Sequence, residues 1–264
     1  MSLKQVQVRV PASVANLGPG LDCFGLALTL YLNLTAEEIG GTGSHLVELE
    51  GEGCDQLAAD ETSLVLRTMI QACAEHDVQP PRLRVVIRNE VPLSRGLGSS
   101  AVDCERLDPL KGVRVVVAVP DFELSTHESR RVRPTDVSRE DAVHALSHSA
   151  MTVAAMATGN LHLLERAMDD RLHEPHRAAL IPDLAQVREA ALAAGALGAF
   201  LGGAGPSVAA LVLPENVEQV EGAMEQVWRR RAINCLVMDL GIEPAGLWVV
   251  ASGSEQPYSQ EGTE

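Results

Sequence analysis

The stretch "VPLSRGLGSSAVDCERLDPLKGVRVVVAV", residues 91–119, decides the fold. Its first part, residues 92–101, follows a predicted strand and carries two spaced glycines and two serines, a pattern typical of a loop that opens a helix. The backbone amides of such a loop, together with the N-terminal end of the helix, can hold phosphate groups. It is not a Walker A loop, because no Gly-Lys-Ser/Thr follows. Taken alone, the pattern is equally typical of an ordinary tight turn.

The sequence after this loop leaves little room for the expected helix. Pro109 and Gly112 interrupt helices, and the β-branched run at 113–120 predicts a buried strand. At about 3.6 residues per turn, only about two turns fit between the loop and Pro109. A crossover between parallel strands takes about a dozen residues or more. Most of the helix is therefore missing from this sequence.

Strands and helices are predicted on both sides of this stretch from alternating or β-branched runs and from helical spacing of apolar residues. The predicted strands are 4–10, 23–38, 44–53, 81–92, 113–120, two short ones within 196–214, 233–240 and 246–250. The predicted helices are 60–76, 138–160, 161–170, 184–195 and 216–232. The mixture indicates a fold of the α/β kind. The polar end of the chain, 253–264, is predicted to be disordered.

Composition excludes several classes of partner. The formal net charge of −15 argues against nucleic acid and anionic membranes, which both need a basic face. Aromatic residues make up only 3% of the chain, so platforms for stacking bases are not expected. The five cysteines are scattered without a C-x-x-C pair, which indicates reduced thiols. The absence of an apolar leader and of a long apolar run predicts a cytoplasmic protein.

Two further glycine-rich segments are candidate binding loops. Asn16 and Asp22 lie in "PASVANLGPGLD" (11–22), where an amide and a carboxylate suit a ligand with an amine and a hydroxyl. A turn with Asx caps is the alternative. The segment 202–207 would by itself be a hairpin turn. A fourth segment, "RLHEPHR" (171–177), could hold a metal or could simply be the polar end of a helix.

Taken together and in this order, the three loops resemble the signature segments of the GHMP kinase superfamily and, within it, those of the homoserine kinases. The resemblance runs from about Val8 to about Val212. It implies the GHMP kinase fold, a two-lobed α/β (α+β, two-layer) architecture with a phosphate loop in the N-terminal lobe and a ferredoxin-like C-terminal lobe. The implied domains are a truncated N-terminal, ATP-binding domain at 1–105 and a C-terminal domain at 106–252.

The resemblance also implies a reaction and a site. The γ-phosphate of ATP, bound with Mg²⁺, would pass to the side-chain hydroxyl of L-homoserine, a step in threonine biosynthesis. Asn16 and Asp22 match the positions that hold the hydroxyl and the amino group, and Arg177 matches the one that pairs with the substrate carboxylate. A homodimer is also implied. The positions that match the ATP-binding loop are Pro92, Leu93, Ser94, Arg95, Gly96, Leu97, Gly98, Ser99, Ser100 and Ala101, with Ser99 on the metal. The positions that match the third motif, beside this loop, are Gly203, Gly205 and Ser207.

The chain departs from the pattern that it resembles. The segment between the phosphate loop and the next strand, which in the family carries a metal-binding carboxylate and an Asn near the substrate, is absent, so no residue here is assigned a catalytic role. Ser63, Ala145 and Gly202 stand where the family usually has Asn, Asn and Ser. Two alternatives follow: a truncated relative that at most binds ligand, or a GHMP kinase for another alcohol such as mevalonate. Asn16, Asp22 and the 169–177 segment favour an amino-acid substrate over mevalonate.

Overall fold

The computed structural model describes residues 5–98, 110, 112–251 and 254–257. The chain divides into two compact units that are interleaved along the sequence. One unit comprises residues 1–11, 30–93 and 245–264, and the other comprises residues 12–29 and 94–244. The domain limits implied by the family, 1–105 and 106–252, stay a prediction. Within the described part of the chain, no helix has the length and apolar character that crossing a bilayer requires.

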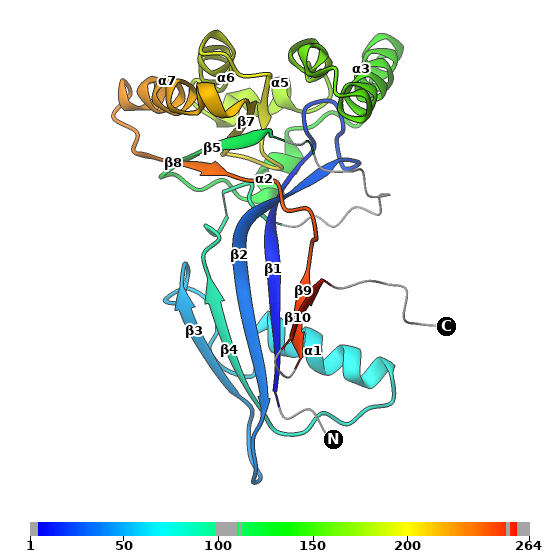
Figure 1. The fold of residues 1–264 in the computed structure, drawn as a ribbon, viewed down its shortest axis with the longest axis vertical. Helices are drawn as coiled ribbons and strands as arrows, with labels where there is room; N and C mark the ends of the chain where they lie inside the picture. Colours follow the sequence, from blue (N-terminus) through cyan, green and yellow to red (C-terminus); the bar gives the residue numbers. More distant parts are fainter. Residues whose placement is uncertain (1–4, 99–109, 111, 252–253, 258–264) are drawn as a thin grey trace. The chain divides into compact units, whose positions relative to one another are not determined.

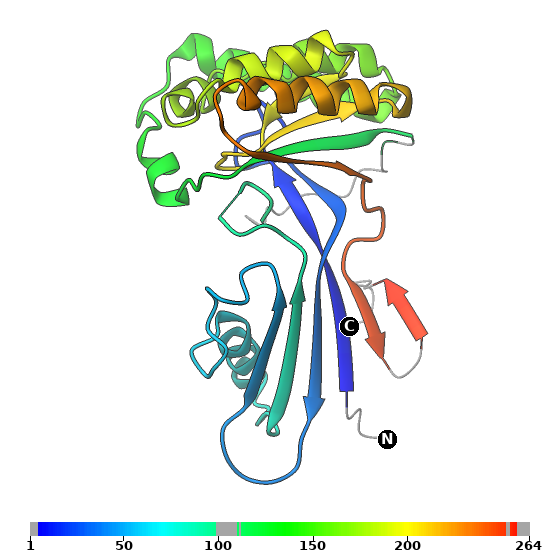
Figure 2. The same ribbon diagram turned by 90° about the vertical axis from the view of Figure 1, so that its left-hand side faces the viewer.

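The first unit is built on a six-stranded sheet with the order β10-β9-β1-β2-β4-β3 (Figures 1 and 2). Strand β3 pairs with β4 in parallel, while β4 runs antiparallel to β2, and β9 runs antiparallel to β1 and β10. The strands are β1 (Gln5–Ala15), β2 (Gly25–Glu38), β3 (Leu46–Gly51), β4 (Leu83–Asn89), β9 (Trp248–Ala251) and β10 (Ser254–Pro257). Helix α1 (Leu64–Glu75) packs its buried Leu66 against three sheet residues, Val47, Val85 and Ile87.

The second unit contains an antiparallel sheet with the order β6-β7-β5-β8. Its strands are β5 (Arg114–Pro120), β6 (Gly198–Leu201), β7 (Val208–Val212) and β8 (Cys235–Leu240). In chain order, β5 is followed by helices, then β6, β7, helix α7 (Val217–Arg229) and β8. This connectivity and strand order are those of a ferredoxin-like layer, which confirms the prediction for the C-terminal lobe.

The helices of the second unit lie mainly over one face of this sheet (Figure 2). They are α2 (Thr126–Arg131), α3 (Arg139–Thr158), the short η1 (Leu161–Leu163), α4 (Leu164–Ala167), α5 (Glu174–Arg177), η2 (Ala178–Leu180), α6 (Leu184–Ala193), η3 (Pro214–Asn216) and α7. Helices α6 and α7 pack on the sheet through a cluster of buried apolar residues. Trp228 is fully buried there, and its indole N–H donates to Pro182 O at 2.8 Å. Burial of this large apolar area is the main stabilising term in the unit.

Four details of the secondary structure differ from the predictions. Strand β1 continues through Pro11, which was expected to begin the loop; its pairing with β9 ends at Arg9, so the missing N–H of Pro11 breaks no bond on that side. The helix expected at 161–170 ends at Ala167. Helix α2 was missed, although Ser125 and Glu128 form a recognisable capping pair. The prediction of disorder is wrong for Ser254–Pro257, which forms β10.

Candidate functional site

The first candidate binding loop begins where β1 ends. Asn16 is buried and adopts φ +80°, in the left-handed region. Its side-chain amide donates to Gly203 O at 2.9 Å, and its Oδ1 accepts from the backbone N–H of Asp22 at 3.1 Å. Asn16 therefore closes the loop on itself and ties it to the third glycine-rich segment. The contact between these two segments was not predicted from the sequence.

Gly18 has a specific structural task in this loop. It adopts φ +78°, and a Cβ there would collide with the backbone of Met168. Its carbonyl accepts from Nε2 of His173 at 2.9 Å, and Pro19 O accepts from the hydroxyl of Ser149 on α3 at 3.1 Å. The loop is thus fixed from two sides by the helical segments, which leaves Asp22 at its exposed end.

Asp22 carries an exposed carboxylate that faces a basic side chain. Its Oδ2 lies 3.2 Å from Nη1 of Arg133, and the Asp22 side chain is 65% exposed. Arg133 belongs to no motif and was not predicted as a site residue; the only signal in the sequence is its place just after Arg130 and Arg131, the last residues of α2. A solvent-accessible carboxylate in an ion pair can exchange its partner for the ammonium group of a ligand.

Arg177 lies on α5 and is almost completely buried. Its Nη1 donates to Nδ1 of His173 at 3.0 Å and to Gly203 O at 2.8 Å, and its Nε donates to Ser129 O at 3.3 Å. Burial, and after it the charge of Arg133, lower the pKa of Arg177, although an arginine keeps its charge in proteins. Within the described part of the chain, Nη2 of Arg177 makes no hydrogen bond. It is the nitrogen left to meet a ligand anion.

His173 connects Arg177 to the first candidate loop through its two ring nitrogens. Since Nδ1 accepts from Arg177 and Nε2 faces Gly18 O, the ring is neutral with its proton on Nε2. Burial lowers the pKa of His173 and so favours this neutral form. The predicted alternative of a metal site in 171–177 does not fit, because both nitrogens of this buried ring are already used.

The turn that presents His173 and Arg177 is held by two buried acids. Asp170 accepts from the backbone N–H groups of Leu172, His173 and Glu174 at 2.8–3.0 Å, which caps the short helix α5. Oε1 of Glu174 accepts from Leu201 N at 2.8 Å, and Oε2 lies 2.6 Å from Nη1 of Arg188 without the alignment of a hydrogen bond. Burial raises the pKa of Glu174 to about 7.

The third glycine-rich segment joins the other two. Gly203 O accepts from both Asn16 and Arg177, and Gly203 N donates to Ala15 O at 3.1 Å. Gly205 adopts φ +88°. The hydroxyl of Ser207 is fully buried and has no partner among the described residues. Residues that are more than 150 positions apart in the sequence therefore meet at one carbonyl group.

The phosphate loop is described from Pro92 to Gly98; Ser99, Ser100 and Ala101 lie outside the described residues. Pro92 and Leu93 belong to the first unit and Ser94–Gly98 to the second. Gly96 adopts φ +54°, and a Cβ there would collide with Gly202 O, so the loop lies directly against the third segment. Leu97 is buried, and Nη2 of Arg95 donates to Asp121 O at 3.0 Å.

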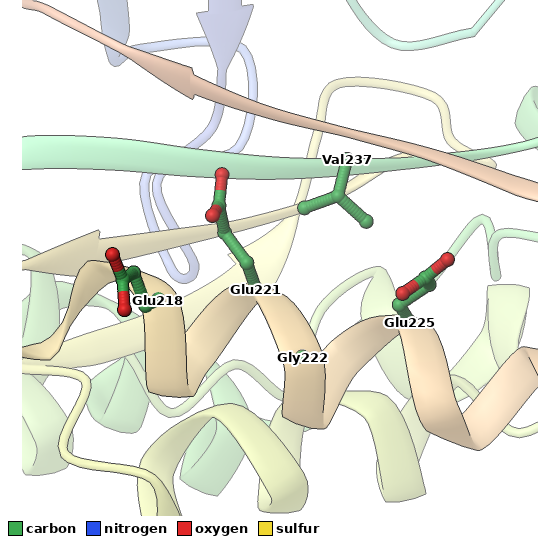
Figure 3. A pocket seen from close by; sticks show the side chains of 5 residues that line it. All are labelled: Glu218, Glu221, Gly222, Glu225 and Val237. Carbon is green, nitrogen blue, oxygen red and sulfur yellow. The ribbon is translucent and has the colours of Figure 1, made fainter.

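A separate pocket lies over α7 and β8, as Figure 3 shows. Its cavity of about 340 Å³ is lined by Glu218, Glu221, Gly222, Glu225 and Val237. Burial, then the charges of Asp239 and Glu218, raise the pKa of Glu221. Three carboxylates would repel the phosphates of a nucleotide. This pocket is therefore not the nucleotide site.

Comparison with known proteins shows to which family the chain belongs. The family pattern described as GHMP kinases C terminal matches residues 152–230. Homoserine kinase from Microchaete diplosiphon is 35% identical over 300 aligned positions, which take in 92% of this chain and 97% of the relative. The chain belongs to the homoserine kinase family. Homoserine kinase from Moorella thermoacetica is 34% identical, with 88% of this chain and 96% of the relative covered.

A solved structure supports the fold independently of the sequence match. The crystal structure of homoserine kinase from Cytophaga hutchinsonii superposes with a TM-score of 0.85 over 95% of this chain and 98% of that chain. The sequence identity is 21%, so this likeness bears on the fold alone. It confirms the GHMP kinase fold predicted for the chain.

The same alignments confirm that this homoserine kinase family member is shorter than its relatives. Because 92% of 264 residues is about 243, about 57 of the 300 aligned positions have no residue in this chain. The alignment with the Moorella thermoacetica relative leaves a gap of similar size. The missing positions lie inside the aligned region; their placement after the phosphate loop stays a prediction.

Proposed function

We propose that this chain is an ATP-dependent kinase that transfers the γ-phosphate of ATP to the side-chain hydroxyl of L-homoserine, giving O-phospho-L-homoserine for threonine biosynthesis in the cytoplasm. The observation that carries the proposal is that Asn16 and Arg177 both donate to Gly203 O, while Oδ1 of Asn16 accepts from the backbone N–H of Asp22. An α-amino acid presents an ammonium and a carboxylate close together, and here an exposed carboxylate and a guanidinium stand within one cluster.

Each residue has a role in the proposed recognition. Asp22 would exchange Arg133 for the substrate ammonium, which replaces one ion pair with another at little cost. Nη2 of Arg177 would bind the substrate carboxylate, with its guanidinium held in place by His173 and Ser129. Asn16 would position the hydroxyl through the second proton of its amide, since the first is donated to Gly203 O. Mevalonate has no ammonium group for Asp22, so an amino-acid substrate fits better.

The phosphate loop supports nucleotide binding as part of this proposal. The close packing of Gly96 on Gly202 leaves no room for a side chain, and it brings the loop to the segment that also holds Asn16 and Arg177. When bound, Mg-ATP supplies the phosphoryl group and the charge that neutralises the developing transition state. The residues of this chain orient the acceptor hydroxyl, and positioning of this kind accounts for a large part of phosphoryl-transfer catalysis.

The described residues do not supply a magnesium site at the loop. Magnesium favours oxygen ligands, and the one described cluster with metal-ligating atoms close together contains two imidazoles and lies elsewhere. Ser99, the predicted metal ligand, lies outside the described residues. No catalytic step is therefore assigned to a metal-bound group of this chain.

The test is ADP release by the purified chain with Mg-ATP, with and without L-homoserine, followed by identification of the phosphorylated product. The proposal predicts ADP release that depends on homoserine and not on mevalonate. A folded chain without homoserine-dependent turnover would contradict it and favour the alternative of a truncated relative. In that case, a chimaera that carries the segment of a longer relative after the phosphate loop should restore turnover.

A further inference from the structure

A cluster of metal-ligating side chains lies outside the site described above. His144 and His148 stand four residues apart on α3 and therefore share one face of the helix. Their rings stack with centroids 3.6 Å apart and an interplanar angle of 21°. Asp169, which follows α4, places Oδ2 3.1 Å from Nε2 of His144. One ligand atom from each of the three residues lies within 4.8 Å of the other two.

The hydrogen bonds around His148 prepare one nitrogen for a ligand. Its Nδ1 lies 2.9 Å from the carbonyl oxygen of His144 and 3.1 Å from the hydroxyl of Ser147. Ser147 donates its own proton to the same carbonyl at 2.8 Å. A proton on Nδ1 that is directed to this carbonyl leaves the lone pair on Nε2. Metal-binding histidines are typically oriented by such a bond from the other ring nitrogen.

The donor set selects a class of ion. Two imidazole nitrogens and one carboxylate oxygen suit Zn²⁺ and the neighbouring divalent transition metals better than Mg²⁺ or Ca²⁺, which favour oxygen alone. In a tetrahedral zinc site with bonds of about 2.0 Å, ligand atoms are about 3.3 Å apart. His144 and Asp169 are already near this separation, and the side chain of Asp169 is 55% exposed and free to adjust. Three protein ligands leave a fourth position open.

We propose that His144, His148 and Asp169 form a binding site for one divalent transition-metal ion of the zinc class. The ion would join α3 to the segment that leads into Asp170, the residue that caps α5. The site uses none of the residues proposed to bind ATP or homoserine, so it stands or falls independently of the proposed kinase activity. Without an ion, the same residues would serve only as a His–Asp hydrogen bond that fastens α3.

The experiment is a titration of the tag-free full chain with Zn²⁺ by calorimetry and with Co²⁺ by absorption spectroscopy. We expect one ion per chain, visible d–d bands with Co²⁺, and a melting temperature that rises with Zn²⁺ concentration. The d–d bands should lack an intense thiolate charge-transfer band, which distinguishes this site from binding by the exposed Cys23 or Cys54. A thiolate band, or no binding, would overturn the proposal.

Three variants locate the site. His148→Gln and Asp169→Asn should each weaken Zn²⁺ binding at least about tenfold, because each removes a ligand and keeps a polar side chain of similar size. His162→Gln is the matched control, since His162 is an exposed histidine on η1 outside the cluster. A melting curve in the absence of metal verifies that each variant folds. Equal Zn²⁺ affinity in His148→Gln and His162→Gln would overturn the proposal.

Discussion

Charged residues serve different purposes in the two compact units. In the first unit, ion pairs between β3 and β4 join Glu48 to Arg84 at 2.8 Å and Glu50 to Arg88 at 2.7 Å, and all four side chains are 44–67% exposed. In the second unit, Glu174 and Arg177 are almost fully buried and bond to the backbone groups of Leu201 and Gly203. Solvent screens the exposed ion pairs of the first unit. In the second unit, no water replaces a lost partner of a buried charged side chain.

The two units therefore differ in what their polar residues do for the structure. A buried polar group is stable only when its hydrogen bonds are made, so each such residue fixes the geometry of its neighbours. The loops that are candidates for binding substrate are held by this buried cluster and not by the exposed ion pairs of the first unit. Variants of the buried cluster should therefore change stability more than variants of the exposed ion pairs.

The largest effect is expected from the titration of Glu174. Its ordinary pKa of 4.5 is raised to about 7 in the folded chain by burial. Between these pH values the folded state holds a proton that the unfolded state has lost, so the free energy of unfolding falls as pH rises from 4.5 to 7. At about 1.4 kcal/mol per pKa unit, this contribution amounts to about 3 kcal/mol.

The measurement is urea unfolding of the wild type and of Glu174→Gln at several pH values from 5 to 8. Glutamine does not titrate, and other groups cancel in the difference between the two curves. The variant should gain stability relative to the wild type as pH rises, and the gain should level off above pH 7. Parallel curves over this range would show that Glu174 stays charged beside Arg188 throughout.

A smaller loss of folding stability is expected from Asn16→Ala. The change removes the bonds to Gly203 O and to Asp22 N and places a residue without an amide at φ +80°. We expect the free energy of unfolding to fall by about 2 kcal/mol and the KM for homoserine to rise. Asn160→Ala is the control, because Asn160 is exposed and its side chain caps no helix. Equal stability of the two variants would refute the role given to Asn16.

Arg133→Leu is expected to change the apparent binding free energy of homoserine by about 1 kcal/mol or less. This variant removes the cation that pairs with Asp22 and that, under the proposed function, competes with the substrate ammonium. The KM for homoserine should fall by up to about fivefold, with kcat unchanged, because a partly exposed ion pair is worth at most about 1 kcal/mol. Steady-state kinetics with varied homoserine concentration would show the lower KM and the unchanged kcat. A rise in KM would show instead that Arg133 contacts the substrate itself.

The smallest effect is expected from Arg84→Met. This residue pairs with Glu48 on the exposed surface of the first unit, and no measurable shift of the urea midpoint is expected. Arg188→Met makes the same chemical change beside the buried Glu174 and should lower the midpoint clearly. If the two variants shifted the midpoint equally, the contrast between exposed and buried charges would be wrong.

The sequence predicted much of the fold because its strongest signals are local. The β-branched run of β5, the spacing of α3 and α7, and the three glycine-rich segments all depend on neighbouring residues. The ferredoxin-like layer and the position of Gly96 beside Gly202 followed from the family resemblance. The sequence also predicts a missing segment after the phosphate loop, because Pro109 and Gly112 leave no room for the expected helix.

The details of the site could not be predicted in the same way. Arg133 reaches Asp22 across 111 positions of sequence, and no motif marks it. The burial of Arg177 and the use of its Nη1 depend on Gly203 O, whose place is fixed only by the tertiary fold. His144 lies on α3 and Asp169 follows α4, and only the tertiary fold brings them within 3.1 Å. Such contacts between distant segments leave no periodic signal in the sequence.

The most direct test of the central claim keeps the protein unchanged and varies the acceptor. The kcat/KM of the wild-type chain would be measured for L-homoserine, for 3-amino-1-propanol, which lacks the carboxylate, and for 4-hydroxybutyrate, which lacks the ammonium. If Arg177 and Asp22 hold these two groups, each analogue should be poorer by a factor on the order of 10 to 100. Equal turnover of homoserine and either analogue, or no turnover of homoserine by the folded chain, would contradict the account.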